Sequence, residues 1–179
     1  MPMHAVDTAL GRGLEQALGW ALRVSAWIGW IALGLMMIVG TADVIGTAFF
    51  RRPIVGAFEM AESALAVVMF LGLIHVQARR NHIVVDLAVA RLRGTARRLA
   101  DCLALLGTAL ALYLVARQTW PLMLDSWRIA EVAGGVFNFP VYPVKTLVCL
   151  GASIATLVAA GQFLRAVVAL FTGAERRDA

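Results

Sequence analysis

Four long apolar segments alternate with shorter polar connections along the chain. The first covers residues 24–50 with Asp43 as its only charge, and the others cover residues 54–78, 100–123 and 142–168. Each is long enough to cross a bilayer as a helix, which takes about 20 residues. None shows the alternating pattern of a barrel strand. The sequence therefore predicts a single-domain, all-α membrane protein with four transmembrane helices.

Two further segments combine an apolar stripe with a charged face. Residues 7–23 repeat leucines at helical spacing opposite Arg12 and Glu15, and residues 82–99 repeat valines and leucines opposite Asp86. This pattern is typical of helices that lie on a membrane surface. We expect an N-terminal amphipathic helix and, between the second and third spans, a cytoplasmic interfacial helix. A plain solvated connector is the alternative for the second segment.

The composition agrees with a membrane protein and narrows the classes of partner. Of the 179 residues, 61% are hydrophobic, and the mean hydropathy is +0.81, whereas soluble domains are about 45–50% apolar. The net charge is +5, but no basic stretch is interleaved with the stacking aromatics that a single-strand binder needs. We therefore expect the lipid bilayer, and no nucleic acid, as a partner.

The basic residues predict the orientation in the membrane. Five of the sixteen lie on the side of the first and third connections, and eleven lie at the termini and in the central connection. Because basic loops stay in the cytoplasm, both termini are predicted to be cytoplasmic. The eleven residues are Arg12, Arg23, Arg79, Arg80, Arg91, Arg93, Arg97, Arg98, Arg165, Arg176 and Arg177.

Charged residues around the first connection allow two main interpretations. Asp43 lies near the outer end of the first span, Glu59 and Glu62 open the second, and Arg51 and Arg52 lie between them. Ionisable groups in membrane segments are costly and are usually functional or paired. The three acids could form an ion or proton site, or the arginines could neutralise them. We favour neutralisation because the cations are so close; pairing with another subunit is a third interpretation.

A metal site at His82 and Asp86 is the other candidate chemistry. The two are four residues apart and could share an ion on one helix face, but two arginines separate them from His75 and no fourth ligand is apparent. We expect them to shape the first turn of the surface helix instead. Cys102 and Cys149 lie in apolar runs without ligand spacing and are expected to be buried small hydrophobes. Phosphate-loop, dinucleotide and nucleophile motifs are absent, so we expect neither an enzyme nor a metal or cofactor in this chain.

Several short stretches carry a resemblance to a known family. The first span ends DVIGTAFFRRPI, the second opens with GAFEMAESAL, a basic turn reads ARRNHIVVDLAVARL, and FPVYPVKTLVCLGASI opens the fourth. Over residues 18–170 the chain resembles the small membrane subunit of tripartite ATP-independent periplasmic (TRAP) transporters, the DctQ-like family. Asn81 departs from the glycine or small residue of many relatives. Arg117 is an unusual charge that needs an acidic or lipid partner, with Asp125 as the candidate.

The resemblance implies a role within a complex. In such systems the small subunit works with a large, DctM-like permease subunit and a periplasmic solute-binding protein. A sodium gradient drives uptake of an organic acid, and the sodium and substrate sites belong to the large subunit. The chain would then be a scaffold in the bacterial inner membrane, without a cofactor of its own.

Faces of small residues offer candidate contacts with that large subunit. The runs LGTALA and LGASIATLVAAG let neighbouring helices approach closely. We expect at least one of these faces to pack against the large subunit, with Gly151 and Ala155 as candidate contacts. The alternative function is a self-sufficient ion-coupled transporter or channel that uses Asp43, Glu59 and Glu62; a haem or quinone subunit is a weaker third.

Overall fold

The computed structural model describes residues 3–78, 95–134 and 138–172, apart from the side chains of 3–12, 14–15, 95–98 and 169–172. Four helices account for most of these residues: α1 (Met3–Phe50), α2 (Ala57–Ala78), α4 (Thr95–Arg128) and α5 (Tyr142–Thr172). All four are long and apolar enough to cross a membrane. The described residues contain no strand, only an isolated bridge between Val132 and Pro140. The predicted all-α fold with four spans is confirmed.

α1 joins two segments that the sequence analysis separates. Residues 7–23 and 24–50 form one uninterrupted helix, without a break at Arg23. Its 48 residues measure about 72 Å, whereas a hydrocarbon layer is roughly 30 Å thick. The part of α1 that is long and apolar enough for a span includes Gln16–Phe50. α1 is therefore too long to lie wholly within the layer, and the contact of residues 7–23 with the membrane surface stays a prediction.

α4 is longer at both ends than the third predicted span. It begins at Thr95, so the last residues of the predicted interfacial helix at 82–99 belong to α4, and the rest of that segment lies outside the described residues. α4 ends at Arg128 and continues through Pro121. Proline has no N–H, so residue 121 cannot donate the usual helical hydrogen bond to the carbonyl of Arg117.

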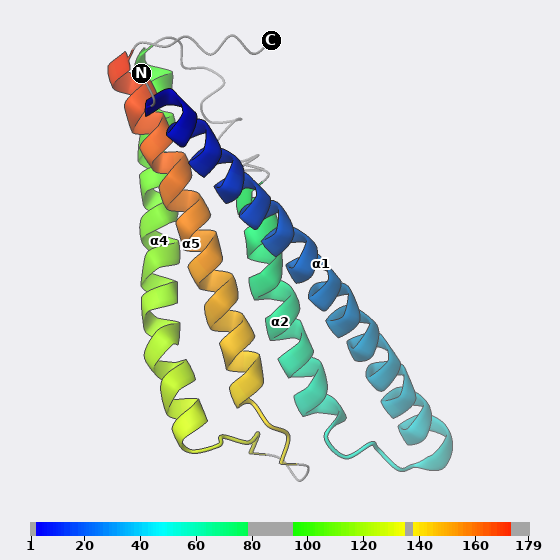
Figure 1. The fold of residues 1–179 in the computed structure, drawn as a ribbon. Coiled ribbons are helices and arrows are strands. Elements are labelled where there is room, and N and C mark those ends of the chain that lie inside the picture. Colours follow the sequence, from blue (N-terminus) through cyan, green and yellow to red (C-terminus); the bar gives the residue numbers. More distant parts are fainter. Residues whose placement is uncertain (1–2, 79–94, 135–137, 173–179) are drawn as a thin grey trace.

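The helices lie side by side in the order α1, α2, α5, α4 instead of closing into a four-helix bundle (Figure 1). The extensive interfaces join α1 to α2, α2 to α5 and α5 to α4. α1 begins and α5 ends at the same end of the molecule, as four antiparallel passes require. α2 and α5 are thus the inner helices, and α1 and α4 are the outer ones.

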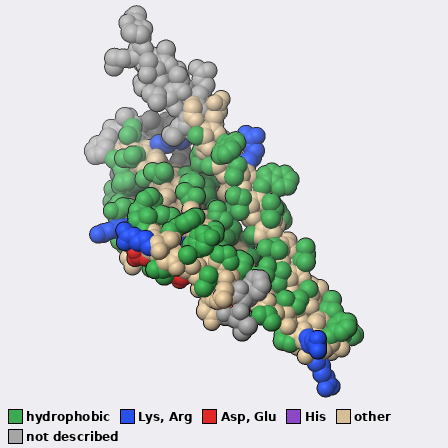
Figure 2. Space-filling view, turned by 60° about the horizontal axis from the view of Figure 1, so that its bottom comes forward, with side chains coloured by type: hydrophobic (Ala, Val, Ile, Leu, Met, Phe, Trp, Pro, Cys, Tyr) green, Lys and Arg blue, Asp and Glu red, His purple; other side chains and the backbone are tan. Residues whose placement is uncertain are grey.

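The core lies on the inner helices. Val67, Leu71 and Ile74 of α2 are buried and repeat at helical spacing on one face. Apolar side chains of α1 and α5 pack against this cluster: Leu22, Ile28, Ala32, Val144, Leu147 and Ile154. Most of the remaining apolar surface is exposed, and Figure 2 shows apolar side chains over most of the visible face. Such a surface requires lipid or another apolar partner.

Candidate functional site

The corner between α1 and α2 is held by backbone contacts around Gly46. Arg51 ends α1 in a left-handed conformation with φ 52°, and the Arg52 N–H donates a hydrogen bond back to the Gly46 carbonyl over 3.1 Å. A Cβ at position 46 would lie 2.8 Å from the Arg52 carbonyl oxygen. Only glycine therefore lets the chain fold back so closely on the last turns of α1.

Asp43 fixes the other side of this corner. Its Oδ1 accepts a hydrogen bond of 2.7 Å from the Ile54 N–H. Gly56 follows with φ 86°, and the Gly56 carbonyl accepts the Met60 N–H as α2 begins. The carboxylate therefore acts as a local cap that ties the last turns of α1 to the connection before α2.

The predicted neutralisation of the three acids by arginines is not observed. Among the described residues, no ion pair joins Asp43, Glu59 or Glu62 to Arg51 or Arg52. Both arginines and Glu62 are exposed, and Glu59 is half-buried. A backbone N–H, which is closer and has a fixed direction, takes the place of a cation at Asp43. The described residues also contain no group of three or more His, Cys, Asp or Glu side chains that could hold a metal.

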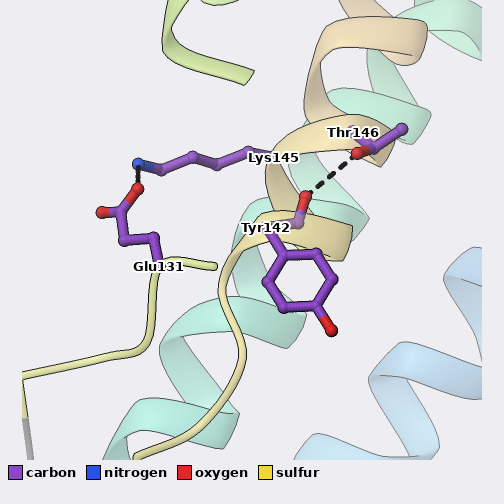
Figure 3. A network of polar contacts seen from close by, with 4 residues as sticks. All are labelled: Glu131, Tyr142, Lys145 and Thr146. Atoms are coloured by element: carbon purple, nitrogen blue, oxygen red, sulfur yellow. Dashed lines mark hydrogen bonds and ion pairs between the residues drawn. The ribbon is translucent and has the colours of Figure 1, made fainter. Parts of the chain in front are cut away.

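The corner between α4 and α5 carries an ion pair. Glu131, in the connection, pairs with Lys145 in the first turn of α5 (Figure 3). The connection is also held by the Val141 N–H, which donates to the Glu131 carbonyl, and by the Glu131 N–H, which donates to the Ser126 carbonyl. The Lys145 ammonium is the main cause that lowers the pKa of the Glu131 carboxyl below its ordinary value.

Trp127 links the ends of α4 and α5 beside this ion pair. Its Nε1–H donates to Thr146 Oγ1 over 2.8 Å, and the Thr146 hydroxyl donates to the Tyr142 carbonyl (Figure 3). The rings of Trp127 and Tyr142 meet edge to face with centroids 4.6 Å apart. Trp127 and Thr146 therefore lie at closely similar depths, which fits an interfacial position for the tryptophan.

Two glutamines join the inner helices near their other ends. Gln77 and Gln162 are 3% and 7% exposed. The Gln77 Nε2 donates to Gln162 Oε1 over 2.9 Å. The Gln162 Nε2 donates to the backbone carbonyl of Gln77 over 2.7 Å. We call this the amide clamp. An amide pair in an apolar layer satisfies groups that would otherwise be costly.

Gly151 and Ala155 also belong to the inner interface, which corrects their predicted role. A Cβ at Gly151 would lie 2.7 Å from the Phe70 carbonyl oxygen of α2, and Ala155 is fully buried. Their face is therefore occupied by α2 of the same chain and is closed to a partner subunit. The small residues do allow close helix approach as expected, but the approaching helix is an internal one.

Arg117 does not pair with Asp125, its predicted partner. Asp125 instead lies 3.5 Å from Arg128, and both members of that pair are largely exposed. Eight residues separate Arg117 from Asp125, about 12 Å along a helix, which exceeds what the two side chains bridge on one face. Arg117 is exposed, and no described acid lies within ion-pair distance of it.

The remaining candidates are His82, Asp86 and the two cysteines. His82 and Asp86 lie outside the described residues. Cys149 is 1% exposed and Cys102 is half-buried. Two open grooves of about 200 and 240 Å³ run between α1 and α2, and both reach His75. Among the residues that line them, only His75 and Arg23 are ionisable.

Sequence reasoning missed the amide clamp and the contacts of the α4–α5 corner. Gln162 interrupts the fourth apolar run and Gln77 lies at the end of the second, so an amide in each run was the available signal. Their pairing depends on α2 and α5 being neighbours, which the sequence does not reveal. Glu131 lies in a connection and Lys145 lies in the first turn of the following helix, where charges are ordinary, and nothing in the sequence distinguishes them.

The comparisons with known proteins agree with this architecture. The sequence profile described as "Tripartite ATP-independent periplasmic transporters, DctQ component" matches residues 36–169, most of the chain. Neither the curated proteins nor the solved structures give a significant match. The matched region begins within the first span and includes the whole of the fourth.

Proposed function

We propose, because the chain belongs to the DctQ component family of tripartite ATP-independent periplasmic transporters, that it is a scaffold for the large permease subunit of such a transporter. The family is one of transporter components and not of enzymes. The complex would take up an organic acid delivered by a periplasmic solute-binding protein, driven by a sodium gradient. Sodium and substrate would bind to the large subunit.

The distribution of polar groups is the observation that carries the scaffold proposal. The described polar side chains of the spans are largely used in internal contacts: the Ser25, Thr108, Ser153 and Thr156 hydroxyls donate to carbonyls of their own helices, and the two buried glutamines bond each other. A hydroxyl bonded in this way has used its only O–H and has no donor left for a substrate carboxylate. The outer helices meanwhile expose broad apolar surfaces that suit a larger membrane partner.

The proposed location is the bacterial inner membrane, with both termini in the cytoplasm. Eleven of the sixteen basic residues lie at the termini and in the central connection, which the positive-inside rule assigns to the cytoplasm. The α1–α2 and α4–α5 corners would then face the periplasm. A cysteine placed at position 52 should accordingly react with a membrane-impermeant maleimide in intact spheroplasts, whereas one at position 176 should react only after lysis.

Reconstitution tests the scaffold function directly. The chain would be co-expressed with the products of its flanking genes, and we expect a long hydrophobic permease to co-purify with it. In proteoliposomes, sodium-dependent uptake of labelled organic acids should require this chain, the permease and the binding protein together. Uptake by this chain alone would contradict the scaffold proposal and favour the alternative, a self-sufficient transporter that uses Asp43, Glu59 and Glu62.

A further inference from the structure

Arg117 lies deep within the apolar layer. On α5, residues 146–164 carry no charge between Lys145 and Arg165 and span about 28 Å, close to the thickness of a hydrocarbon layer. The hydrogen bond from Trp127 to Thr146 places Trp127 near one edge of that layer. Arg117 precedes Trp127 by ten residues, about 15 Å along α4. Its Cα is therefore near the middle of the layer, where a guanidinium needs a counter-charge.

The described part of this chain offers no such counter-charge. Its acids in and between the spans lie near the helix ends or in the connections: Asp43, Glu59, Glu62, Asp101, Asp125 and Glu131. Arg117 is exposed on α4, which packs extensively on α5 alone. The partner of the guanidinium therefore comes from outside the described chain.

α4 has two faces with the same spacing, and the described residues cover only one of them. Seven residues with alternating spacings of four and three are buried or half-buried on the side of α5: Leu105, Ala109, Leu112, Ala116, Thr119, Met123 and Ser126. Seven others with spacings of three and four are all exposed: Leu103, Leu106, Leu110, Tyr113, Arg117, Trp120 and Leu124. We call the second set the open seam. Its period of 3.5 is the one that packs against another helix at a small crossing angle.

The depth of Arg117 disfavours lipid phosphate as the partner. Its Cα lies about 15 Å from one edge of the layer and roughly as far from the other. An arginine side chain, which starts toward the helix N-terminus, is shorter than either distance. In the same turn, the backbone carbonyl of Arg117 has no helical N–H donor, because the residue four positions later is Pro121, which has no N–H. A second copy of this chain is equally unsuitable, because a parallel pairing of two open seams would place Arg117 against Arg117.

We propose that the open seam of α4 packs against a membrane-spanning helix of the large permease subunit, and that Arg117 pairs there with a carboxylate of that helix. This inference rests on the proposed function as a subunit of a tripartite transporter. A polar residue within an otherwise apolar seam fixes the register of the two helices. Arg117 therefore sets how this chain docks, in addition to contributing binding energy.

Replacing Arg117 with leucine tests the pairing, because it has opposite effects on the chain and on the complex. In lipid nanodiscs, Arg117→Leu should raise the apparent melting temperature of the isolated full chain by a few degrees, since a charge without a partner is removed from the layer. In the co-expressed complex, it should lower recovery of the permease with this chain at least about tenfold, because the partner carboxylate is left unpaired. Arg117→Lys should lose less, and Arg128→Leu, at the exposed end of α4, should recover the permease fully.

A photocrosslinking residue at position 110 identifies the neighbour while Arg117 stays intact. We expect it to crosslink to the permease, whereas the same residue at position 157, exposed on α5, should not. Undiminished recovery with Arg117→Leu, or crosslinking at position 110 to lipid only, would overturn the inference. If the wild-type chain recovers no permease at all, the proposed function fails instead, so the two failures are distinguishable.

Discussion

The inner helices, α2 and α5, bury many more side chains within the protein than the outer helices, α1 and α4. On α2 and α5 the buried residues recur at helical spacing, from Ala64 to Gln77 and from Cys149 to Gln162. On α1 and α4 the only described buried side chains are Ser25 and Ser126. All four helices have similar mean hydropathy over their most apolar stretches. Hydropathy thus predicts that a helix crosses the layer, but not whether protein or lipid surrounds it.

The inner interface depends on close approach and paired amides because apolarity alone does not hold helices together in lipid. Hydrocarbon is as apolar as leucine, so helix association in a membrane relies on packing and hydrogen bonds. Gly151 provides the first and the amide clamp the second. The exposed faces of the outer helices have neither a close backbone approach nor a paired amide, and Arg117 is the polar group on the open seam. Substitutions on the inner helices should therefore change the stability of this chain, and those on the open seam should change its assembly.

The largest expected effect follows from filling the space at Gly151. Gly151→Ala places a Cβ 2.7 Å from the Phe70 carbonyl oxygen, so the α2 and α5 backbones must separate, at a cost of about 1–3 kcal/mol. Gly151→Leu should prevent α2 from packing on α5 altogether. Thermal unfolding of the full chain in nanodiscs, followed by circular dichroism, measures both.

Gly161→Ala is the matched control on the same helix. No atom lies within 4 Å of a Cβ added there, so the substitution should leave the melting temperature unchanged or slightly higher, as alanine favours helix. Equal effects at positions 151 and 161 would contradict the close approach of α2 and α5. Loss of the permease with Gly151→Leu would follow from misfolding of this chain and would not identify a docking face.

The four spans could be predicted from the sequence because the thickness of the bilayer sets their length. A run such as residues 24–50 therefore indicates a span without knowledge of any contact. The ends were less accurate, since nothing ends the helix at Arg23 in α1 or at Met123 in α4, and helical propensity simply continues. Their order in space, with α5 between α2 and α4, depends on tertiary packing that local patterns do not contain.

The same limit applies to the candidate residues, whose importance could be predicted but whose partners could not. Asp43 was identified as unusual from its place in an apolar run, but its partner, the Ile54 N–H, depends on the shape of the corner. Gly151 and Ala155 were identified as contact residues, but a small-residue face has the same sequence whether the neighbouring helix is internal or external. The sequence therefore predicts which residues make contacts better than it predicts what they contact.

The second prediction concerns the amide clamp. Gln162→Leu should destabilise the chain by about 1–2 kcal/mol, because the Gln77 amide is left buried without its partner. The double replacement with Gln77→Leu should cost less than the sum of the two single replacements, since both amides are then gone. Melting temperatures of the four proteins form a double-mutant cycle. Additive losses would show that the two amides do not act as a pair.

The third prediction tests whether the acids at the α1–α2 corner have a structural or an ion-coupling role, with Asp43 measured by stability and Glu62 by uptake. Asp43→Ala removes the acceptor of the Ile54 N–H and should cost about 1 kcal/mol, whereas Asp43→Asn keeps an acceptor and should restore most of the loss. Glu62→Gln, at an exposed position, should be neutral for stability and for sodium-dependent uptake by the complex. Abolished uptake in Glu62→Gln, with an intact complex, would favour the ion-coupling alternative.

The smallest expected effect is at Glu131, where the ion pair is partly exposed. The Lys145 ammonium lowers the pKa of the Glu131 carboxyl below 4.5, its ordinary value. The pair therefore contributes its full stability above pH 4.5, and the contribution is lost as the pH falls through the lowered pKa of the folded chain. The melting temperature of wild type should exceed that of Glu131→Gln at neutral pH, and the difference should vanish in acid. Asp125→Asn, which removes the more exposed pair with Arg128, is the control and should show no difference at either pH. A wild-type advantage that persists unchanged in acid would assign the stability of this corner to Trp127 and the backbone contacts instead of the ion pair.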